Sequence, residues 1–250
     1  MLLGYSTIND IVDSGTELAV LAVGSIEQHG PHLPVTTDWE IATALGKGIA
    51  EKNRAFYVPA LPVSTNREQM GRRGSAVGMN PKTFYDMMWD ICTCLNNQGF
   101  KKIGIIQAHG GIFIMTPLVR ELNATFQPDL MVAKLDYLDV WPELAPAGIL
   151  ESGNELHSGE GETSLMLHLR PELVHMDKAV DWVPKDIERG DLNYGSILRY
   201  CPDGVWGEAK RATAEKGEKM LNYLIDALSN RMARAFELME DKEKLGYSWF

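Results

Sequence analysis

Two carboxylates and two imidazoles lie close together in one short stretch of the chain. Glu27, His29, His32 and Asp38 fall within twelve residues, directly after the uninterrupted apolar run of residues 18–23. Carboxylate oxygens and imidazole nitrogens are common ligands of divalent metals. A short apolar run is typical of a buried strand in a parallel sheet, and open α/β sheets bind ligands beyond the carboxyl ends of such strands. The stretch therefore predicts a metal site at a strand end.

Two later segments carry residues of the same kinds. His109 follows a second apolar run, at residues 102–106, and His157 and Glu162 belong to a third segment. In a parallel sheet the first two groups lie at the same edge, so we expect a convergent set that could hold two divalent cations with one bridging carboxylate: Glu27, His29, Asp38, His109 and Glu162. Such a pair of cations can activate a water for attack on a carbonyl. Because these stretches contain no Cys, we expect Zn, Mn or Fe rather than a structural, sulfur-bound zinc.

Each residue also has a simpler explanation. Asp38 stands where a helix should begin, and Asp is a favoured N-cap residue. Glu27 and His29 could form a solvated turn, and His109 could bond a backbone carbonyl. Their recurrence at the ends of predicted strands favours the metal site. His32 is expected to be a structural residue or to contact the metal ligands without binding a metal itself.

Strands and helices are expected to alternate along the chain. The apolar runs predict strands at residues 18–23, 55–63, 102–106 and 130–135, and amphipathic spacing predicts helices at 38–52, 81–98, 113–126 and 208–240, with a short helix ending near Pro171. Asn80, Pro81 and Gly99 mark the two ends of the second helix. Apolar strands that alternate with helices predict a mostly parallel sheet covered on both faces. No repeat or linker divides the chain, so we expect one domain over residues 1–250.

Composition limits the function classes. The chain has 250 residues and a net charge of −10, which argues against nucleic acid or an anionic membrane as a partner. Three cysteines without framework spacing indicate a reducing compartment. The opening Met1-Leu2-Leu3-Gly4 lacks the pattern of a signal peptide, and no apolar run is long enough to span a membrane. We therefore expect a cytoplasmic protein that acts on a small molecule.

Three motifs carry a resemblance to a known family. The run from Gly24 to Pro34, with Thr37-Asp38 behind it, resembles the opening signature of the creatininase (creatinine amidohydrolase) family. His109-Gly110-Gly111 resembles that family's Asn-Gly-His-Gly-Gly-Asn, and the segment from His157 to Ser164 resembles its His-Ala-Gly…Glu-Thr-Ser. The resemblance covers about residues 18–170. It implies a three-layer α/β/α fold, a dinuclear metal site, hydrolysis of a cyclic or linear amide C–N bond, and homo-oligomers, often hexamers built as trimers of dimers.

The resemblance also implies a ligand set. Glu27, Asp38 and His109 would hold one metal, and His29, Asp38 and a further carboxylate would hold the other, with Asp38 bridging. Creatininase itself has a glutamate two residues after the strand-end histidine, where this chain has Gly111. Glu162 is the expected replacement, with Glu160 as the second choice.

Mechanism and substrate follow as expectations. His157 is expected to protonate the leaving nitrogen, Glu162 or Asp38 to move the proton of the water, and the backbone N–H groups of Gly110 and Gly111 to hold the oxyanion. The family often carries a Glu-His and a Phe-Pro-Gly-Thr segment after the second strand. The corresponding loop here, from Arg67 to Ser75, lacks that His and gains Arg72 and Arg73. Arginine binds carboxylate and phosphate bidentately, so these two indicate an anionic or polyhydroxylated substrate, unless they form only a solvated loop.

Several alternatives remain open from the sequence. Within the family, the chain could open the ring of a cyclic ketone or lactam-like metabolite, deformylate a formylaminopyrimidine, or clip a peptide. A second class is a metal-dependent sugar isomerase or aldolase, which would consume no water. A third is a metal-stabilised small-molecule-binding protein without catalysis, although the glycines beside His109 suggest space left for a ligand.

Overall fold

A four-stranded parallel sheet forms the centre of the protein. The computed structural model describes residues 6–240, so the opening Met1–Gly4 lies outside it. The strands β1 (Leu18–Val23), β3 (Phe56–Leu61), β5 (Lys102–Gln107) and β6 (Met131–Asp136) pair in the order β3-β1-β5-β6, each pair parallel. Five of the six β1 residues are buried, because the strand is covered on both faces. The predicted parallel sheet is confirmed.

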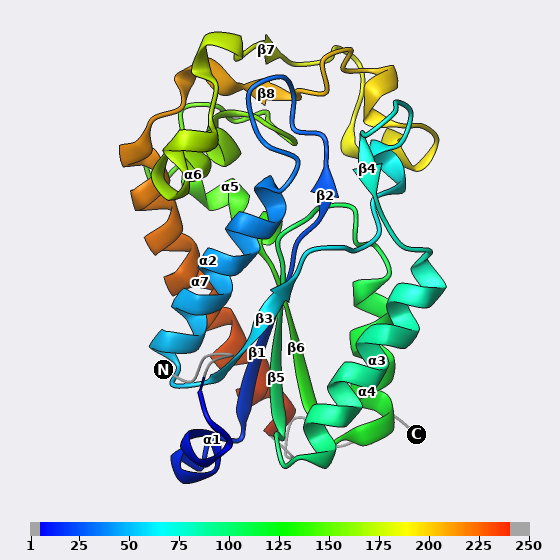
Figure 1. Cartoon of the computed structure of the whole chain (residues 1–250), viewed down its shortest axis with the longest axis vertical. Helices are drawn as coiled ribbons and strands as arrows, with labels where there is room; N and C mark the ends of the chain where they lie inside the picture. The colour runs from blue at the N-terminus through cyan, green and yellow to red at the C-terminus, as the bar shows by residue number, and fades with distance from the viewer. Residues whose placement is uncertain (1–5, 241–250) are drawn as a thin grey trace.

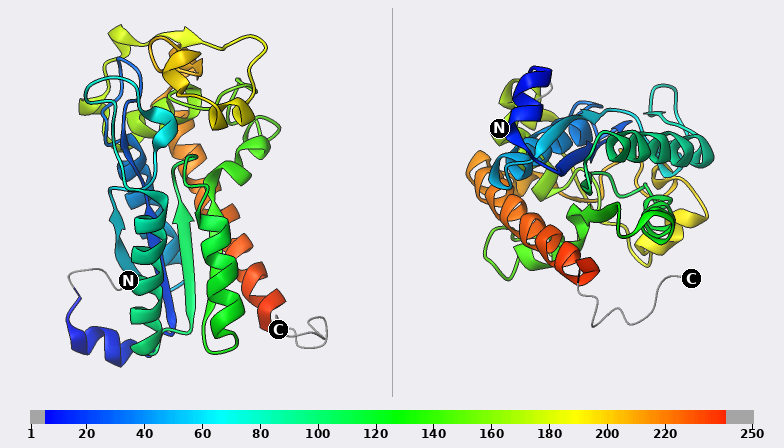
Figure 2. Two further views of the ribbon diagram at one scale, coloured as in Figure 1. Left: turned by 90° about the vertical axis from the view of Figure 1, so that its right-hand side faces the viewer. Right: turned by 90° about the horizontal axis from the view of Figure 1, so that it is seen from below.

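Helices cover both faces of this sheet (Figures 1 and 2). The helices α2 (Thr37–Lys52), α6 (Glu160–Leu169) and α7 (Ala214–Glu240) contribute to the apolar core on one face. The helices α3 (Pro81–Asn97) and α4 (Met115–Phe126) contribute to the core on the other. Two short helices, α1 (Ile8–Ser14) and α5 (Trp141–Leu144), complete the set. The expected three-layer α/β/α arrangement is therefore confirmed.

The predicted ends of α3 are also confirmed. The Asn80 side chain accepts a hydrogen bond from the Lys82 N–H at 3.0 Å, Pro81 is the first helical residue, and Gly99, just past the end, has a φ of +97°. That left-handed φ favours glycine.

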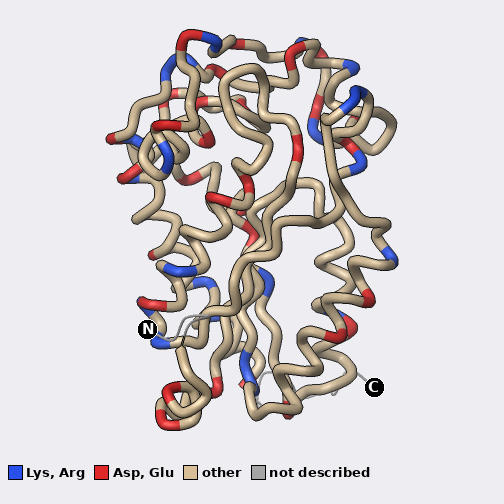
Figure 3. Tube along the Cα trace, in the orientation of Figure 1, with Lys and Arg blue, Asp and Glu red and all other residues tan. Residues whose placement is uncertain are grey.

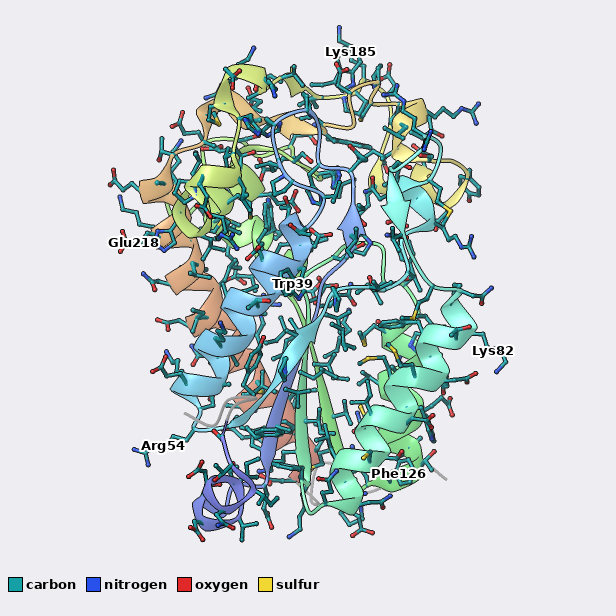
Figure 4. All side chains as sticks on the ribbon, viewed as in Figure 1. Trp39, Arg54, Lys82, Phe126, Lys185 and Glu218 are labelled. Atoms are coloured by element: carbon teal, nitrogen blue, oxygen red, sulfur yellow. The ribbon has the colours of Figure 1, made fainter. Side chains whose placement is uncertain are left out.

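The start of α2 differs from the simpler expectation for Asp38. The helix begins at Thr37 and its N-cap is Thr36, which makes no side-chain capping bond. Asp38 therefore lies inside the first turn and is not the N-cap, so its carboxylate is free for other partners. The next residue, Trp39, lies between α2 and β3 (Figure 4) and donates from Nε1 to the carbonyl of Ala60 at 3.1 Å. This bond ties the first turn of α2 to the sheet.

Irregular segments and small sheets cover the carboxyl ends of the strands (Figure 1). Strand β2 (Ile26–Glu27) pairs with β4 (Ala76–Val77), and β7 (Asp181–Trp182) pairs with β8 (Gly207–Glu208), both antiparallel. The remaining turns are short 3₁₀ helices: η1 (Arg67–Gln69), η2 (Tyr137–Asp139), η3 (Pro171–Leu173), η4 (Met176–Lys178), η5 (Arg189–Asn193), η6 (Ile197–Arg199) and η7 (Ala209–Arg211).

The last helix starts later than predicted. It was expected from residue 208, but Gly207–Glu208 forms β8 and Ala209–Arg211 forms a 3₁₀ turn, so α7 begins at Ala214. The Lys210 N–H donates to Asp181 at 2.9 Å, and the Thr213 hydroxyl accepts from the Lys216 N–H at 3.2 Å. Tertiary pairing with β7 and this local cap override the helical pattern of the sequence. Within residues 6–240, no helix is both long and apolar enough to cross a membrane.

We predict that Gly217→Ala destabilises the protein, because α7 packs tightly against α6 at this residue. A Cβ at position 217 would overlap the carbonyl oxygen of Ser164. Overpacking of this kind costs about 1–3 kcal/mol, so the urea midpoint of unfolding should fall. Gly153→Ala is the control, since a Cβ there meets nothing within 4 Å. Equal midpoints for the two variants would contradict a tight helix contact at Gly217.

Candidate metal centre and active site

The residues singled out in the sequence meet beyond the carboxyl ends of β1 and β5. Glu27 ends β2, His29 follows it, Asp38 lies in the first turn of α2, and His109 comes two residues after β5. Glu162 arrives from the first turn of α6. All five side chains are buried. Figure 3 shows acidic positions gathered inside the molecule, just above the sheet.

Asp38 lies between two imidazoles. Its Oδ1 is 3.1 Å from His29 Nε2, and its Oδ2 is 3.1 Å from His109 Nδ1. On one side, His109 Nε2 is 3.2 Å from Glu27 Oε2, and on the other, His29 Nε2 is 3.8 Å from Glu162 Oε2. Glu27, Asp38 and His109 thus form one group whose ligand atoms lie within 4.8 Å of one another, and His29, Asp38 and Glu162 form a second. These are the two sets expected for a pair of ions that share Asp38.

Unpaired buried atoms show that the cluster fits a cation. Glu27 Oε1 is buried without a hydrogen-bond partner, and Asp38 Oδ2 and His109 Nε2 are buried with ion-pair contacts but no well-aligned hydrogen bond. Buried polar atoms are rarely left unpaired unless an ion or water satisfies them. The cavity that these residues line has a volume of about 30 Å³, which is room for about two water-sized groups. The donor set of carboxylates and imidazoles suits Zn, Mn or Fe.

The electrostatics of the cluster also favour cations. Burial raises the pKa of Glu27. Burial opposes the protonation of His29, but the neighbouring Asp38 and Glu162 outweigh it and raise its pKa to about 9. Burial acts against ionisation of Asp38 too, yet the adjacent His29 and His109 hold its pKa below the ordinary value. The carboxylates beside these imidazoles keep them protonated. A divalent ion bound here would balance the same negative charge.

Neighbouring groups orient the ligand atoms. His29 Nδ1 donates to the backbone carbonyl of Glu27 at 3.1 Å, which leaves Nε2 facing Asp38. Glu162 accepts from the Tyr137 hydroxyl at 2.8 Å and from the Ser158 N–H at 2.6 Å. Tyr137 was not predicted as a site residue. Its place directly after β6, at a strand end like the others, is the one signal that could have found it.

His157 has a defined orientation beside this cluster. Its Nε2 lies 2.7 Å from the carbonyl oxygen of Gln28, which can only accept, so Nε2 carries the hydrogen. Nδ1 is then unprotonated and lies 3.9 Å from Glu27 Oε1, and the ring lies 4.3 Å from that of His29. Burial and the nearby His29 lower the pKa of His157 to about 3. The residue is therefore a neutral imidazole with a free Nδ1.

Of the two candidate glutamates in α6, only Glu162 reaches the cluster. Glu160 points away from it: its carboxylate accepts from the Ser152 N–H at 2.6 Å and from Lys216 Nζ at 2.6 Å. A different carboxylate, Glu68, lies 3.1 Å from His109 Nε2. A Cβ added at Gly111 would overlap Glu68, so this carboxylate takes up the space beside that glycine. Nothing in the sequence spacing distinguished Glu68, because the loop that contains it carries no strand or helix period.

The predicted substrate-binding residues divide between two places. Gly110 and Gly111 line the cavity of the cluster. Arg72 and Arg73 line a separate hollow of about 270 Å³. The arginine at the cavity is instead Arg189, an exposed side chain whose Nη2 donates to the carbonyl of Gly110 at 3.1 Å. It lies in a loop-rich region in which the sequence offered no motif.

Known proteins are similar to this chain in sequence. The sequence profile described as "Creatininase: Creatinine amidohydrolase" matches residues 4–232. A creatinine amidohydrolase from Pseudomonas putida is 30% identical over 240 residues, covering 90% of this chain and 92% of that protein. A 3-dehydro-scyllo-inosose hydrolase from Thermotoga maritima is 26% identical over 236 residues, covering 85% and 75%.

Solved structures agree with the sequence matches. The crystal structure of a creatinine amidohydrolase (creatininase) superposes with a TM-score of 0.76 at 26% identity, covering 94% of this chain and 98% of that chain. The profile spans nearly the whole chain. The resemblance of the three sequence motifs is accompanied by similarity of the three-dimensional fold. The chain belongs to the creatininase family.

Proposed function

We propose that this protein is a metal-dependent hydrolase that cleaves an amide C–N bond of a small polar substrate. The observation that carries the proposal is the convergence of buried carboxylates and imidazoles with unpaired ligand atoms at the end of the sheet. Relatives support it, since their names describe hydrolysis of creatinine, of a precursor peptide and of a formylamino compound. Solved creatininases are described as Mn and as Zn-Zn forms.

In this proposal the site holds two divalent ions. Glu27, Asp38 and His109 would bind one, and His29, Asp38 and Glu162 the other, with Asp38 shared. When bound, such ions acidify a water and polarise a carbonyl group.

His157 moves the proton. With Nε2–H held by the carbonyl of Gln28, Nδ1 is the atom that faces the cluster. It accepts a proton from the attacking water as the C–O bond forms, and it returns this proton to the leaving nitrogen as the C–N bond breaks. The sequence predicted only the general-acid role of His157. In this scheme Nδ1 acts first as the base, and the general-acid step follows.

Other groups orient the substrate. The Tyr137 hydroxyl and the Ser158 N–H fix the Glu162 carboxylate from two sides. The backbone of Gly110 and Gly111 lines the cavity, where N–H groups can stabilise an oxyanion. Arg189, at the same cavity, has hydrogen-bond donors for carboxylate or hydroxyl groups of the substrate. Arg72 and Arg73 would contact only a substrate that extends to their separate hollow.

We predict that Asp38→Ala abolishes metal binding. The wild-type protein, loaded and then dialysed, should retain about two equivalents of Zn, Mn or Fe per chain, measured by elemental analysis. Because Asp38 faces both groups, its loss should remove both ions together. Asp139→Ala, at an exposed residue, should keep the wild-type content. A wild-type chain without metal, or one ion that is indifferent to Asp38, would refute the bridged pair.

We predict that His157→Gln lowers kcat by about 10²–10⁴-fold while metal content stays unchanged. Substrates for the test are creatinine, an N-formyl amine, a short peptide and a cyclic polyhydroxy ketone, each assayed for metal-dependent hydrolysis. His168→Gln is the matched control, since His168 lies exposed on α6. If His157→Gln retained both its metals and full turnover, His157 would have no part in proton transfer.

A further inference from the structure

One polar turn is buried against the metal centre without belonging to it. In the segment Asn66–Gln69, which contains η1, the side chains of Asn66, Glu68 and Gln69 are buried, whereas Arg67 between them is exposed. Burying polar side chains is costly unless they make specific bonds. Apolar packing does not explain this turn, and each of its buried side chains has specific polar partners.

Asn66 acts on Glu27 through a serine. Its Nδ2 donates to Ser25 Oγ at 3.0 Å, and Ser25 Oγ donates to Glu27 Oε2 at 2.7 Å. The same amide also donates to the carbonyl of Ile26 at 3.1 Å, which fixes it in place. This relay occupies one oxygen of Glu27. The other oxygen, Oε1, is the one left unpaired inside the site.

Glu68 acts on His109. Its Oε1 lies 3.1 Å from His109 Nε2, while His109 Nδ1 lies 3.1 Å from the shared Asp38. Glu27 Oε2, already bonded to Ser25, lies 3.2 Å from the same Nε2. Both ring nitrogens of His109 therefore face carboxylates, and the contact of Glu68 with Nε2 fixes the orientation of the ring towards Asp38. Glu68 thus has the position of an outer carboxylate that orients a ligating histidine.

Gln69 acts on His157. Its Oε1 accepts from Gln28 Nε2 at 2.8 Å, and Gln28 Oε1 accepts from the Gly30 N–H at 3.0 Å. The side chain of Gln28 is therefore held at both ends. His157 Nε2 donates to the backbone carbonyl of the same Gln28 at 2.7 Å. The Gln28 amide nitrogen, itself a donor, lies 3.1 Å from that ring nitrogen and packs against it without bonding to it.

We infer that the Asn66–Gln69 turn is a positioning element of the active site, in which three inward side chains set the orientation of Glu27, His109 and His157. Directly at His109, and through Ser25 and Gln28, the turn acts on one residue from each of three segments that are far apart in the sequence. For its effect on ions this inference rests on the proposed function, but the imidazole orientations that it specifies are a property of the metal-free protein as well.

The test compares Glu68→Ala, Ser25→Ala and Gln69→Ala with Arg67→Gln, at the exposed residue of the same turn. Affinity for Zn²⁺ is measured on the full chain by competition with a chromophoric chelator. Loss of such an outer partner typically weakens metal binding by about 10–100-fold, which we expect for Glu68→Ala and Ser25→Ala. Gln69→Ala and Arg67→Gln should keep the wild-type affinity. Glu68→Gln, which retains an acceptor oxygen, should lose less affinity than Glu68→Ala.

Imidazole ¹⁵N NMR of the metal-free proteins supplies the second measurement. Glu68→Ala should shift the Nε2 signals of His109, and Gln69→Ala should shift the signals of His157 only. Thermal melts confirm that each variant is folded. Unchanged imidazole signals together with wild-type Zn²⁺ affinity in Glu68→Ala and Ser25→Ala would overturn the inference. If the wild type bound no Zn²⁺ but the imidazole signals shifted as expected, the proposed function would fail and the positioning role would stand.

Discussion

The structure depends on holding several negative charges in one buried place. Asp38 lies between two imidazoles, with Glu27 and Glu162 on either side, and each carboxylate is removed from water. An uncompensated buried charge is strongly unfavourable. The surrounding elements compensate these carboxylates, because they supply imidazoles, a tyrosine hydroxyl and a backbone N–H group at fixed distances. They leave a few atoms unpaired, and these are the atoms that can bind a cation.

Much of the fold could be predicted because its signals are local. The strands are continuous apolar runs, and Asn80, Pro81 and Gly99 mark helix ends by rules that act within a few residues. The clustering of the five candidate ligands could be anticipated for a related reason: each follows a strand or starts a helix at one edge of the sheet. The late start of α7 could not be predicted, since it depends on pairing with β7, distant in the sequence.

The residues that escaped prediction have partners that only the folded chain brings close. Glu68, Tyr137 and Arg189 act through contacts to His109, Glu162 and Gly110, which belong to other segments. The glycine at position 111 illustrates the point. In sequence it is a missing glutamate, whereas in the structure Glu68 of another loop stands in the space that a side chain there would need.

The sheet and the loops contribute different parts of the site, and this has a further consequence for how members of the family can differ. The clustered ligands sit at strand ends and helix starts, fixed by the core, whereas the cavity mouth is lined by Arg189, Leu192 and Ile197 of short 3₁₀ turns. Such turns tolerate substitution and insertion far better than a buried sheet. Changes in these turns can therefore alter which molecule is admitted while the clustered side chains at the edge of the sheet stay in place. Relatives whose names describe different substrates are consistent with that separation.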